Sequence, residues 1–280
     1  MTLVMGIVNV TPDSFSDGGR YLDAEAAVAH GLSLRTRGAH ILDVGGESTR
    51  PGAERVHPDV EQERVLPVVR ALAAAGAVVS IDTMNASTAV AAVAAGARIV
   101  NDVSGGLADP DLLAAVAPTG ADVALSHWRG PSADMYARAA YTDVATEIVS
   151  ELAGRIEAAA AAGIAPSRLI IDPGIGFGKR GEQNWAALRG MDRLISLGPR
   201  VLVGTSRKRF LAQALADDPD DFAAITDERR DLATAVTSVL AAQAGVWAVR
   251  VHDVAATRDA LLVAKSWEGE SRWASPMRSR

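Results

Sequence analysis

Polar and charged residues recur along the sequence, each at or just after the end of a short apolar run. In chain order they are Asn9, Asp43, Asp82, Asn101 with Asp102, His127, Asp172, residues 206–208 (Ser-Arg-Lys), and Arg250 with His252. Asp and Asn are common in turns, and a turn cap explains Asp43 or Asp102 alone as well as a functional role does. It explains the whole set poorly, because these residue types together make up a mixed binding site.

One subset combines hydrogen-bond acceptors, an amide and a donor, and it consists of Asp82, Asn101, Asp172 and Lys208. A carboxylate can accept two parallel N–H bonds, and an asparagine offers a donor and an acceptor side by side. This subset therefore predicts a flat, nitrogen-rich heterocycle as ligand.

A second subset is cationic and consists of Arg50, Arg250 and His252, with Asn9 nearby. Arginine recognises phosphate oxygens through its planar, forked donors, so this subset predicts a phosphate or pyrophosphate group. Surface ion pairing is the usual alternative for an arginine, but it fits Arg250 less well because Arg250 stands at a strand end.

The stretch RLIIDPGIGFGKR, residues 168–180, resembles a phosphate-binding loop but matches neither common glycine motif. A P-loop would need glycine at Pro173 and a hydroxyl at Arg180, and a dinucleotide fingerprint would need glycine at Lys179. We interpret it as a strand that ends in Asp172, followed by a Pro-Gly turn.

Lysine is rare in this chain. Only Lys179, Lys208 and Lys265 are lysines among 28 basic residues. A lysine retained against such a bias indicates a position where the broader guanidinium of arginine does not fit.

The elements that carry these residues follow a repeated order. Eight Val/Ile/Leu-rich runs alternate with turns and with alanine-rich stretches of helical periodicity, such as residues 59–76 and 144–163. These runs do not alternate between apolar and polar residues, and helices separate them. Both features are typical of a parallel sheet that is buried on both faces. Eight such units predict an α/β fold, a (β/α)8 TIM barrel, and a doubly wound open sheet is the alternative.

In such barrels the active site lies at the carboxyl ends of the strands, where the polar residues stand. No linker-like stretch divides the chain, so we expect one domain over residues 1–268. Residues 269–280 lose all periodicity and are expected to form a disordered tail.

The composition excludes several classes of protein. The net charge is −6, which argues against a general nucleic-acid-binding surface, and no apolar run is long enough to span a membrane. The absence of cysteine excludes disulfides and thiolate chemistry and fits a cytoplasmic protein.

Two long polar loops follow the first two strands, TPDSFSDGGRY and GGESTRPGAERVHPD. They carry Phe15 and Arg50, respectively. Loops of this composition after barrel strands are candidates for mobile lids, and ordinary surface connections are the alternative.

Seven motifs in order resemble the dihydropteroate synthases, a family of folate-pathway enzymes. They are MGIVNVTPDSFSDGG, LDVGGESTRPG, SIDT, IVNDVSGG, DPGIGFGK, VGTSRKRF and VRVHDV, and they extend from Met5 to about Trp267. The resemblance implies a barrel that condenses 6-hydroxymethyl-7,8-dihydropterin pyrophosphate with p-aminobenzoate, with Mg²⁺ assisting. It implies as well a homodimer that acts on small molecules.

The resemblance also implies roles for individual residues, here given in this chain's numbers. The pterin would be bound by Asp82, Asn101, Asp172 and Lys208. The pyrophosphate would be bound by Asn9, which would also hold the Mg²⁺, with Arg50, Arg250 and His252. The p-aminobenzoate pocket would be walled by Phe15, Thr49, Pro51, Phe177 and Ser206. Asp17, Arg50 and Lys208 would be catalytic, with Asp17 stabilising the developing cation.

Two positions depart from the family's pattern. Arg209 stands where some members carry serine, so the contacts to the p-aminobenzoate carboxylate stay open. The sequence LSHW replaces a more familiar Met-His pair, so the role of His127 stays open too.

The implied chemistry agrees with the residue types. Pyrophosphate leaves readily once Mg²⁺ and arginines neutralise its charge, and the remaining cation would be conjugated to the electron-rich pterin. This favours a dissociative mechanism that needs no strong general base. Three alternatives remain: a pterin-dependent methyltransferase, an aldolase with Lys208 as Schiff-base former, and a non-catalytic pterin-binding paralogue.

Overall fold

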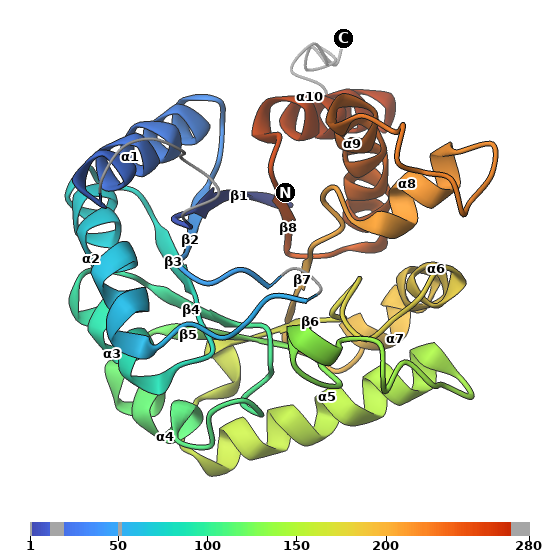
Figure 1. Cartoon of the computed structure of the whole chain (residues 1–280). Helices are drawn as coiled ribbons and strands as arrows, with labels where there is room; N and C mark the ends of the chain where they lie inside the picture. The colour runs from blue at the N-terminus through green and yellow to red at the C-terminus, as the bar shows by residue number, and fades with distance from the viewer. Residues whose placement is uncertain (1, 12–19, 50–51, 270–280) are drawn as a thin grey trace, which may run out of the picture.

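A computed structural model describes residues 2–11, 20–49 and 52–269 of the 280-residue chain. In the described part, eight parallel strands close into a barrel in chain order, and β1 pairs with β8 (Figure 1). The strands are β1 (Leu3–Asn9), β2 (Ile41–Gly45), β3 (Val79–Asp82), β4 (Ile99–Asp102), β5 (Asp122–Ser126), β6 (Leu169–Asp172), β7 (Arg200–Val203) and β8 (Ala248–Val251). The predicted (β/α)8 barrel is confirmed. The open sheet is excluded, because Leu3 of β1 is in register with Ala248 of β8.

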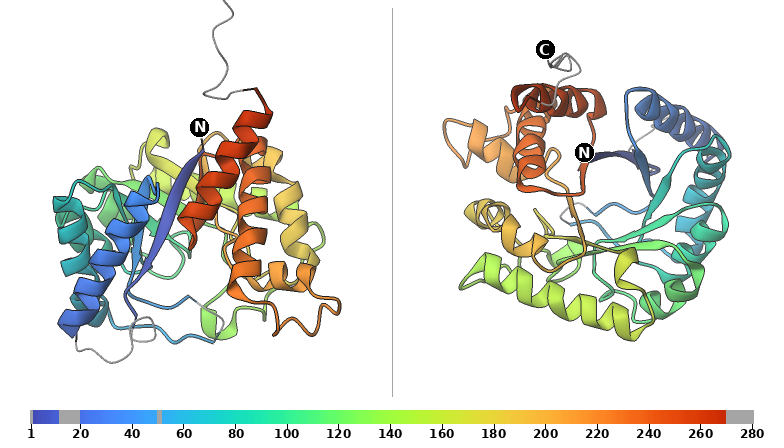
Figure 2. Two further views of the ribbon diagram at one scale, coloured as in Figure 1. Left: turned by 90° about the horizontal axis from the view of Figure 1, so that it is seen from above. Right: turned by 180° about the vertical axis from the view of Figure 1, so that it is seen from behind.

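Helices cover the outside of this barrel. They are α1 (Arg20–Thr36), α2 (Pro58–Ala74), α3 (Ala86–Ala94), α4 (Leu112–Val116), α5 (Val144–Ala161), α6 (Glu182–Arg189), α7 (Met191–Ile195), α8 (Arg209–Leu215), α9 (Asp227–Ala244) and α10 (Val254–Trp267). Short 3-10 turns lie at Ala117–Thr119, Ser132–Asp134 and Pro166–Arg168. Figure 2 shows α1 and α10, from opposite ends of the chain, flanking β1. No helix of the described ranges is long and apolar enough to cross a membrane.

The structure refines the element boundaries. Each apolar run contains one strand and extends beyond it by a few residues, except the first, which matches β1 at both ends. Helix α9 begins at Asp227, because the Thr226 hydroxyl caps it and Asp227 and Glu228 occupy its first turn. The predicted tail falls almost wholly on residues 270–280, which lie outside the described residues.

Strand alternation separates the barrel interior into layers. The lower layer is a small apolar cluster, which consists of Met5, Ile41, Ile99, Ala124, Ile170, Leu202 and Ala248. Side chains two positions further along a strand point the same way, one step nearer its carboxyl end. That next layer contains Asp43, Asn101, Asp172 and Arg250. The other strand faces pack against the helices in the large outer core.

Glycines allow two close approaches in the segment after β6. Gly174 has a φ of +63°, and a Cβ there would collide with the carbonyl oxygen of His127. Gly176 has a φ of +82°, and a Cβ there would lie 2.8 Å from Cδ of Lys208. These two glycines therefore admit a neighbouring backbone and the stem of Lys208.

We expect Gly174→Ala to lower the free energy of unfolding by about 2 kcal/mol or more, because it combines a positive φ with a backbone collision. Gly120→Ala is the matched control, since Gly120 has a φ of +78° with no atom within 4 Å of an added Cβ. The control should lose only about 1 kcal/mol, the cost of the left-handed conformation alone. Urea unfolding measures both, and equal losses would contradict the role assigned to the close approach.

Candidate active site

A buried charge cluster lies at the centre of the barrel's carboxyl end. Nε of Arg250 donates to Oδ2 of Asp43 at 2.6 Å, and Nη2 donates to Oδ2 of Asp82 at 2.7 Å. Nδ2 of Asn101 donates to the same oxygen of Asp43 at 3.0 Å. Because the guanidinium presents several donors in one plane, Arg250 can bridge the two carboxylates from β2 and β3.

Burial and charge oppose one another in this cluster. Burial raises the pKa of Asp82 to about 7, although Arg250 acts to lower it. Burial alone would lower the pKa of Arg250, but the attraction of Asp43 and Asp82 outweighs it and raises that pKa. Arg250 therefore stays charged, whereas the charge on Asp82 is sensitive to what enters the site.

Asp172 and Lys208 form the second part of the site. Oδ1 of Asp172 accepts from the backbone N–H of Gly174 at 2.6 Å, and Oδ2 accepts no hydrogen bond from the described residues. Burial raises the pKa of Asp172, while Lys208 and the Gly174 N–H act to lower it. The carboxylate thus presents one oxygen for a ligand.

Lys208 is held from the same segment. Its ammonium donates to the carbonyl oxygen of Ile175, and Nζ lies 4.6 Å from the centre of the Phe177 ring. Burial lowers the pKa of Lys208 to about 8, against the attraction of Asp172. The short backbone between Asp172 and Phe177 therefore orients both charged groups.

Ser206 and His252 position each other. Oγ of Ser206 accepts from the backbone N–H of His252 at 3.0 Å and lies 2.8 Å from its Nδ1. One hydroxyl therefore contacts both the backbone and the ring of His252, which fixes the orientation of the imidazole.

The structure brings most of the predicted residues to one end of the barrel. Asn9 ends β1 and is half-buried, as are Thr49 and Phe177. Four predicted residues lie outside the described residues, and they are Phe15, Asp17, Arg50 and Pro51. Arg209 is exposed, and its guanidinium carbon lies 4.8 Å from the centre of the Phe222 ring.

The two aspartates that could have been turn caps differ. Asp102 is a cap, since it accepts from N and Oγ of Ser104, at 2.8 and 2.6 Å, and from N of Gly106 at 2.5 Å. Asp43 is part of the charge cluster. Asp43 lies two residues after Ile41 on β2, so both side chains point to the same face of the strand. Strand alternation thus indicates that Asp43 faces the barrel interior.

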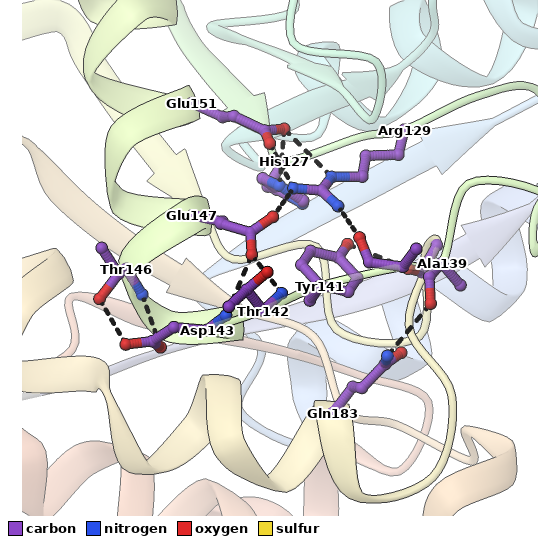
Figure 3. Close-up of polar contacts among 12 residues, drawn as sticks. His127, Arg129, Ala139, Tyr141, Thr142, Asp143, Thr146, Glu147, Glu151 and Gln183 are labelled. Carbon is purple, nitrogen blue, oxygen red and sulfur yellow. Dashed lines mark hydrogen bonds and ion pairs between the residues drawn. The ribbon is translucent and has the colours of Figure 1, made fainter.

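His127 lies behind the site, between the barrel and α5. Its Nδ1 is 2.9 Å from Nζ of Lys179, and its Nε2 is 3.0 Å from Oε2 of Glu151. Figure 3 shows His127 beside Glu151 and Arg129, with Arg129 bridging Glu147 at 2.6 Å and Glu151 at 2.5 Å. Burial lowers the pKa of His127 to about 4, so the ring is neutral at pH 7. The histidine thus joins a supporting network.

A second supporting network was not predicted from the sequence. Nδ2 of Asn85 donates to Glu61 at 2.7 Å, and Nη2 of Arg55 donates to Oδ1 of Asn85 at 2.7 Å. Nε of Arg55 also pairs with Glu47 at 2.9 Å. These contacts join helices α2 and α3 to the chain between β2 and α2. No local motif indicates them, because each partner comes from a different segment.

Comparisons with known proteins agree with this site. Residues 5–252 match the family described as pterin binding enzyme. A dihydropteroate synthase from Mycobacterium leprae is 52% identical over 265 residues, which cover 94% of this chain and 93% of that protein.

Solved structures of a Xanthomonas albilineans dihydropteroate synthase are similar as well. One with 4-aminobenzoic acid has a TM-score of 0.87 and 46% identity, covering 98% of this chain and 94% of that one. Another, in complex with 7,8-dihydropteroate, has a TM-score of 0.83 and 43% identity, covering 98% and 95%. This chain belongs to the dihydropteroate synthase family of pterin-binding enzymes.

Proposed function

We propose that the protein condenses 6-hydroxymethyl-7,8-dihydropterin pyrophosphate with p-aminobenzoate, giving 7,8-dihydropteroate and pyrophosphate. The observation that carries this proposal is Oδ2 of Asp172, an acceptor presented beside Lys208 above the apolar layer of the barrel. An aminopyrimidine edge needs such an acceptor for its N–H groups. The relatives solved with 4-aminobenzoic acid and with 7,8-dihydropteroate support the choice of substrates.

The pterin would lie between the two parts of the site. Asp172 would accept from its N–H edge, Asn101 and Asp82 would bind from the opposite strands, and Lys208 would donate to a ring acceptor. The apolar layer below limits how deep the ring can enter and keeps water from beneath it. Phe177, next to Lys208, would then face the p-aminobenzoate.

The pyrophosphate would lie toward Asn9, His252 and Arg250, with Arg50 as a further ligand. A group of three or more His, Cys, Asp or Glu that could hold a metal is absent from the described residues. That fits Mg²⁺, which commonly takes one or two protein oxygens and completes its shell with water and substrate phosphates. Asn9 would supply such an oxygen, and the ion would neutralise charge on the leaving group.

We infer a dissociative reaction. The carbon–oxygen bond to pyrophosphate breaks, and the leaving group takes the electron pair. The resulting cation is conjugated to the pterin and lies near Asp82 and Asp172, with Asp17 as a further carboxylate, and these would stabilise it. The amine nitrogen of p-aminobenzoate then forms the new bond and releases one proton to water.

The decisive assay measures pyrophosphate and dihydropteroate with and without p-aminobenzoate. We expect both products in equal amounts only when p-aminobenzoate and Mg²⁺ are present. Pyrophosphate release that does not respond to p-aminobenzoate would contradict the proposal. The expected cytoplasmic location stays a prediction.

Asp172→Asn should weaken pterin binding about tenfold to a hundredfold. A buried polar group that loses its hydrogen-bond partner costs about 1–3 kcal/mol of binding free energy. The Gly174 N–H requires an acceptor, so the amide oxygen must turn to it and the NH₂ must face the ligand's own N–H. Calorimetry with the pterin measures the effect. Asp102→Asn, a strand-end carboxylate that caps a turn, is the matched control and should keep the pterin affinity.

Lys208→Arg should lower kcat/KM at least about tenfold, or about 1.4 kcal/mol of transition-state stabilisation. The lysine stem passes Gly176 so closely that an added Cβ would be 2.8 Å from Cδ, and the forked guanidinium needs more room than the ammonium. Steady-state kinetics test this with Lys265→Arg as the control. Wild-type activity of the Lys208 variant would mean that charge alone matters there.

We also propose that the protein is a homodimer joined through α9 and α10, which pack against each other. Helix α9 exposes an apolar stripe of Leu232, Val236 and Leu240, at 66%, 53% and 58% exposure. Val263 and Trp267 of α10 are exposed by 70% and 90%. An apolar stripe continued across two packed helices is typical of a surface that another copy covers.

Leu240→Glu should therefore convert the dimer to a monomer in sedimentation velocity, with the dissociation constant raised at least about a hundredfold by a charge buried in an apolar interface. Leu107→Glu, a change at another half-exposed leucine in the segment between β4 and α4, is the control and should leave the dimer intact. A wild-type protein that sediments as a monomer would contradict the proposal.

A further inference from the structure

Lys179 is the largest fully buried side chain described, with 1% of its surface exposed, and the proposed reaction does not use it. Nζ lies 2.9 Å from Nδ1 of His127, 2.9 Å from the carbonyl oxygen of Gly174 and 3.0 Å from that of Phe177. An ammonium group has three hydrogens, and each one has a partner here. Such a complete set distinguishes Lys179 from a lysine that is buried only because its stem packs well.

The neighbours of Lys179 assign the proton positions. His127 and Arg129 lower the pKa of Glu151 to about 2, so Glu151 is ionised, and its Oε2 lies 3.0 Å from Nε2 of His127, a charge contact that falls outside hydrogen-bond geometry. A carboxylate at that distance favours a proton on Nε2, which leaves Nδ1 of the neutral ring as an acceptor. Lys179 is therefore the donor to His127. Burial lowers the pKa of Lys179 and opposes its charge, while Asp172 and the three acceptors favour the protonated form.

These bonds close the segment of residues 173–179 on itself. The two carbonyl acceptors, at Gly174 and Phe177, are five and two positions before Lys179, so one ammonium joins the start and the end of the turn. Asn184 of α6 supports the same turn, since its Oδ1 accepts from N of Gly176 at 2.7 Å. The hydroxyl of Tyr141 donates to the carbonyl oxygen of Gly178 at 3.0 Å.

The closed segment presents two groups to Lys208. Residues Ile175 and Phe177 flank the middle of the turn, and Lys208 donates to the carbonyl oxygen of the first and faces the ring of the second. A shift of the turn would therefore move both contacts together. The segment is also connected to helix α5 through the contact of His127 with Glu151. Arg129 bonds to both Glu147 and Glu151 of that helix (Figure 3).

We propose that Lys179 is a positioning residue for the second substrate: its ammonium, supported by His127, holds the turn that sets Phe177 and Lys208 where p-aminobenzoate binds. The proposal rests on the proposed function for the identity of that substrate. The competing explanation is that Lys179 contributes only to the stability of the core.

The principal test replaces Lys179 with methionine, which keeps the length of the stem and removes the ammonium. We expect kcat/KM for p-aminobenzoate to fall about tenfold, mainly through a higher KM. The pterin affinity, measured by calorimetry, should fall by a smaller factor, because the pterin shares Asp172 and Lys208 with this turn but keeps Asp82 and Asn101 on other strands. Lys265→Met is the matched control at the far end of α10 and should leave all three values unchanged. A lower melting temperature with unchanged kinetics would overturn the proposal.

The scarcity of lysine supplies a readout that needs no substrate. Protein labelled with ¹³C and ¹⁵N in lysine has three side-chain ammonium signals, from Lys179, Lys208 and Lys265. In Lys179→Met we expect the Lys208 signal to shift and the Lys265 signal to stay in place. An unchanged Lys208 signal would contradict the proposal. If wild-type protein forms no dihydropteroate, the proposed function fails, while this spectrum still shows whether Lys179 positions Lys208.

A matched pair at His127 keeps the test decisive if Lys179→Met does not fold. The side-chain oxygen of asparagine can occupy the place of Nδ1 and still accept from Lys179, whereas the longer glutamine reaches the place of Nε2 and faces Glu151 instead. We expect His127→Asn to keep kcat/KM for p-aminobenzoate within about threefold and His127→Gln to lower it about tenfold. The reverse order, or equal effects, would overturn the proposal.

Discussion

The ion pairs of Arg250 with Asp43 and Asp82 are the constraint on which the rest of the site depends. Two carboxylates that face each other in a barrel interior repel one another and lose hydration, so neither is stable there without a fixed cation. Arg250 supplies it from β8, the strand that closes the barrel against β1. The charge balance of the site therefore requires the closed barrel, and removing the arginine alone would leave two buried carboxyl groups without their cation.

The opposite side of the site is organised by backbone rather than by ion pairs. The turn after β6 contains glycines at positive φ, and one of them admits the carbonyl of His127 while another admits the stem of Lys208. Because backbone groups orient Asp172 and Lys208, both side chains keep part of their bonding capacity for a ligand. The site thus combines a rigid charged side, from β2, β3 and β8, with a turn whose shape depends on the buried Lys179.

The sequence allowed the barrel and much of the site to be predicted, because both follow from short-range pattern. Apolar runs marked all eight strands, and residues such as Asp82 and Asp172 end their strands. The pairing of Arg250 with Asp43 could not be predicted, since it joins positions 207 residues apart and depends on strand stagger. The rarity of lysine singled out Lys179, but its bond to His127 arises only when β5 and β6 lie side by side.

The two sides of the site explain how one pocket can favour both binding and reaction. Asp43, Asp82 and Asp172 carry up to three negative charges, against the positive charges of Arg250 and Lys208. With all three carboxylates ionised, the pocket holds one excess negative charge. Burial raises the pKa of Asp82 to about 7, so this excess is only partly present before a ligand arrives. On the proposed mechanism, departure of pyrophosphate creates a cation beside Asp82. That cation favours the ionised form of Asp82. Asp82 therefore stabilises the positive charge more strongly in the transition state than in the bound substrate.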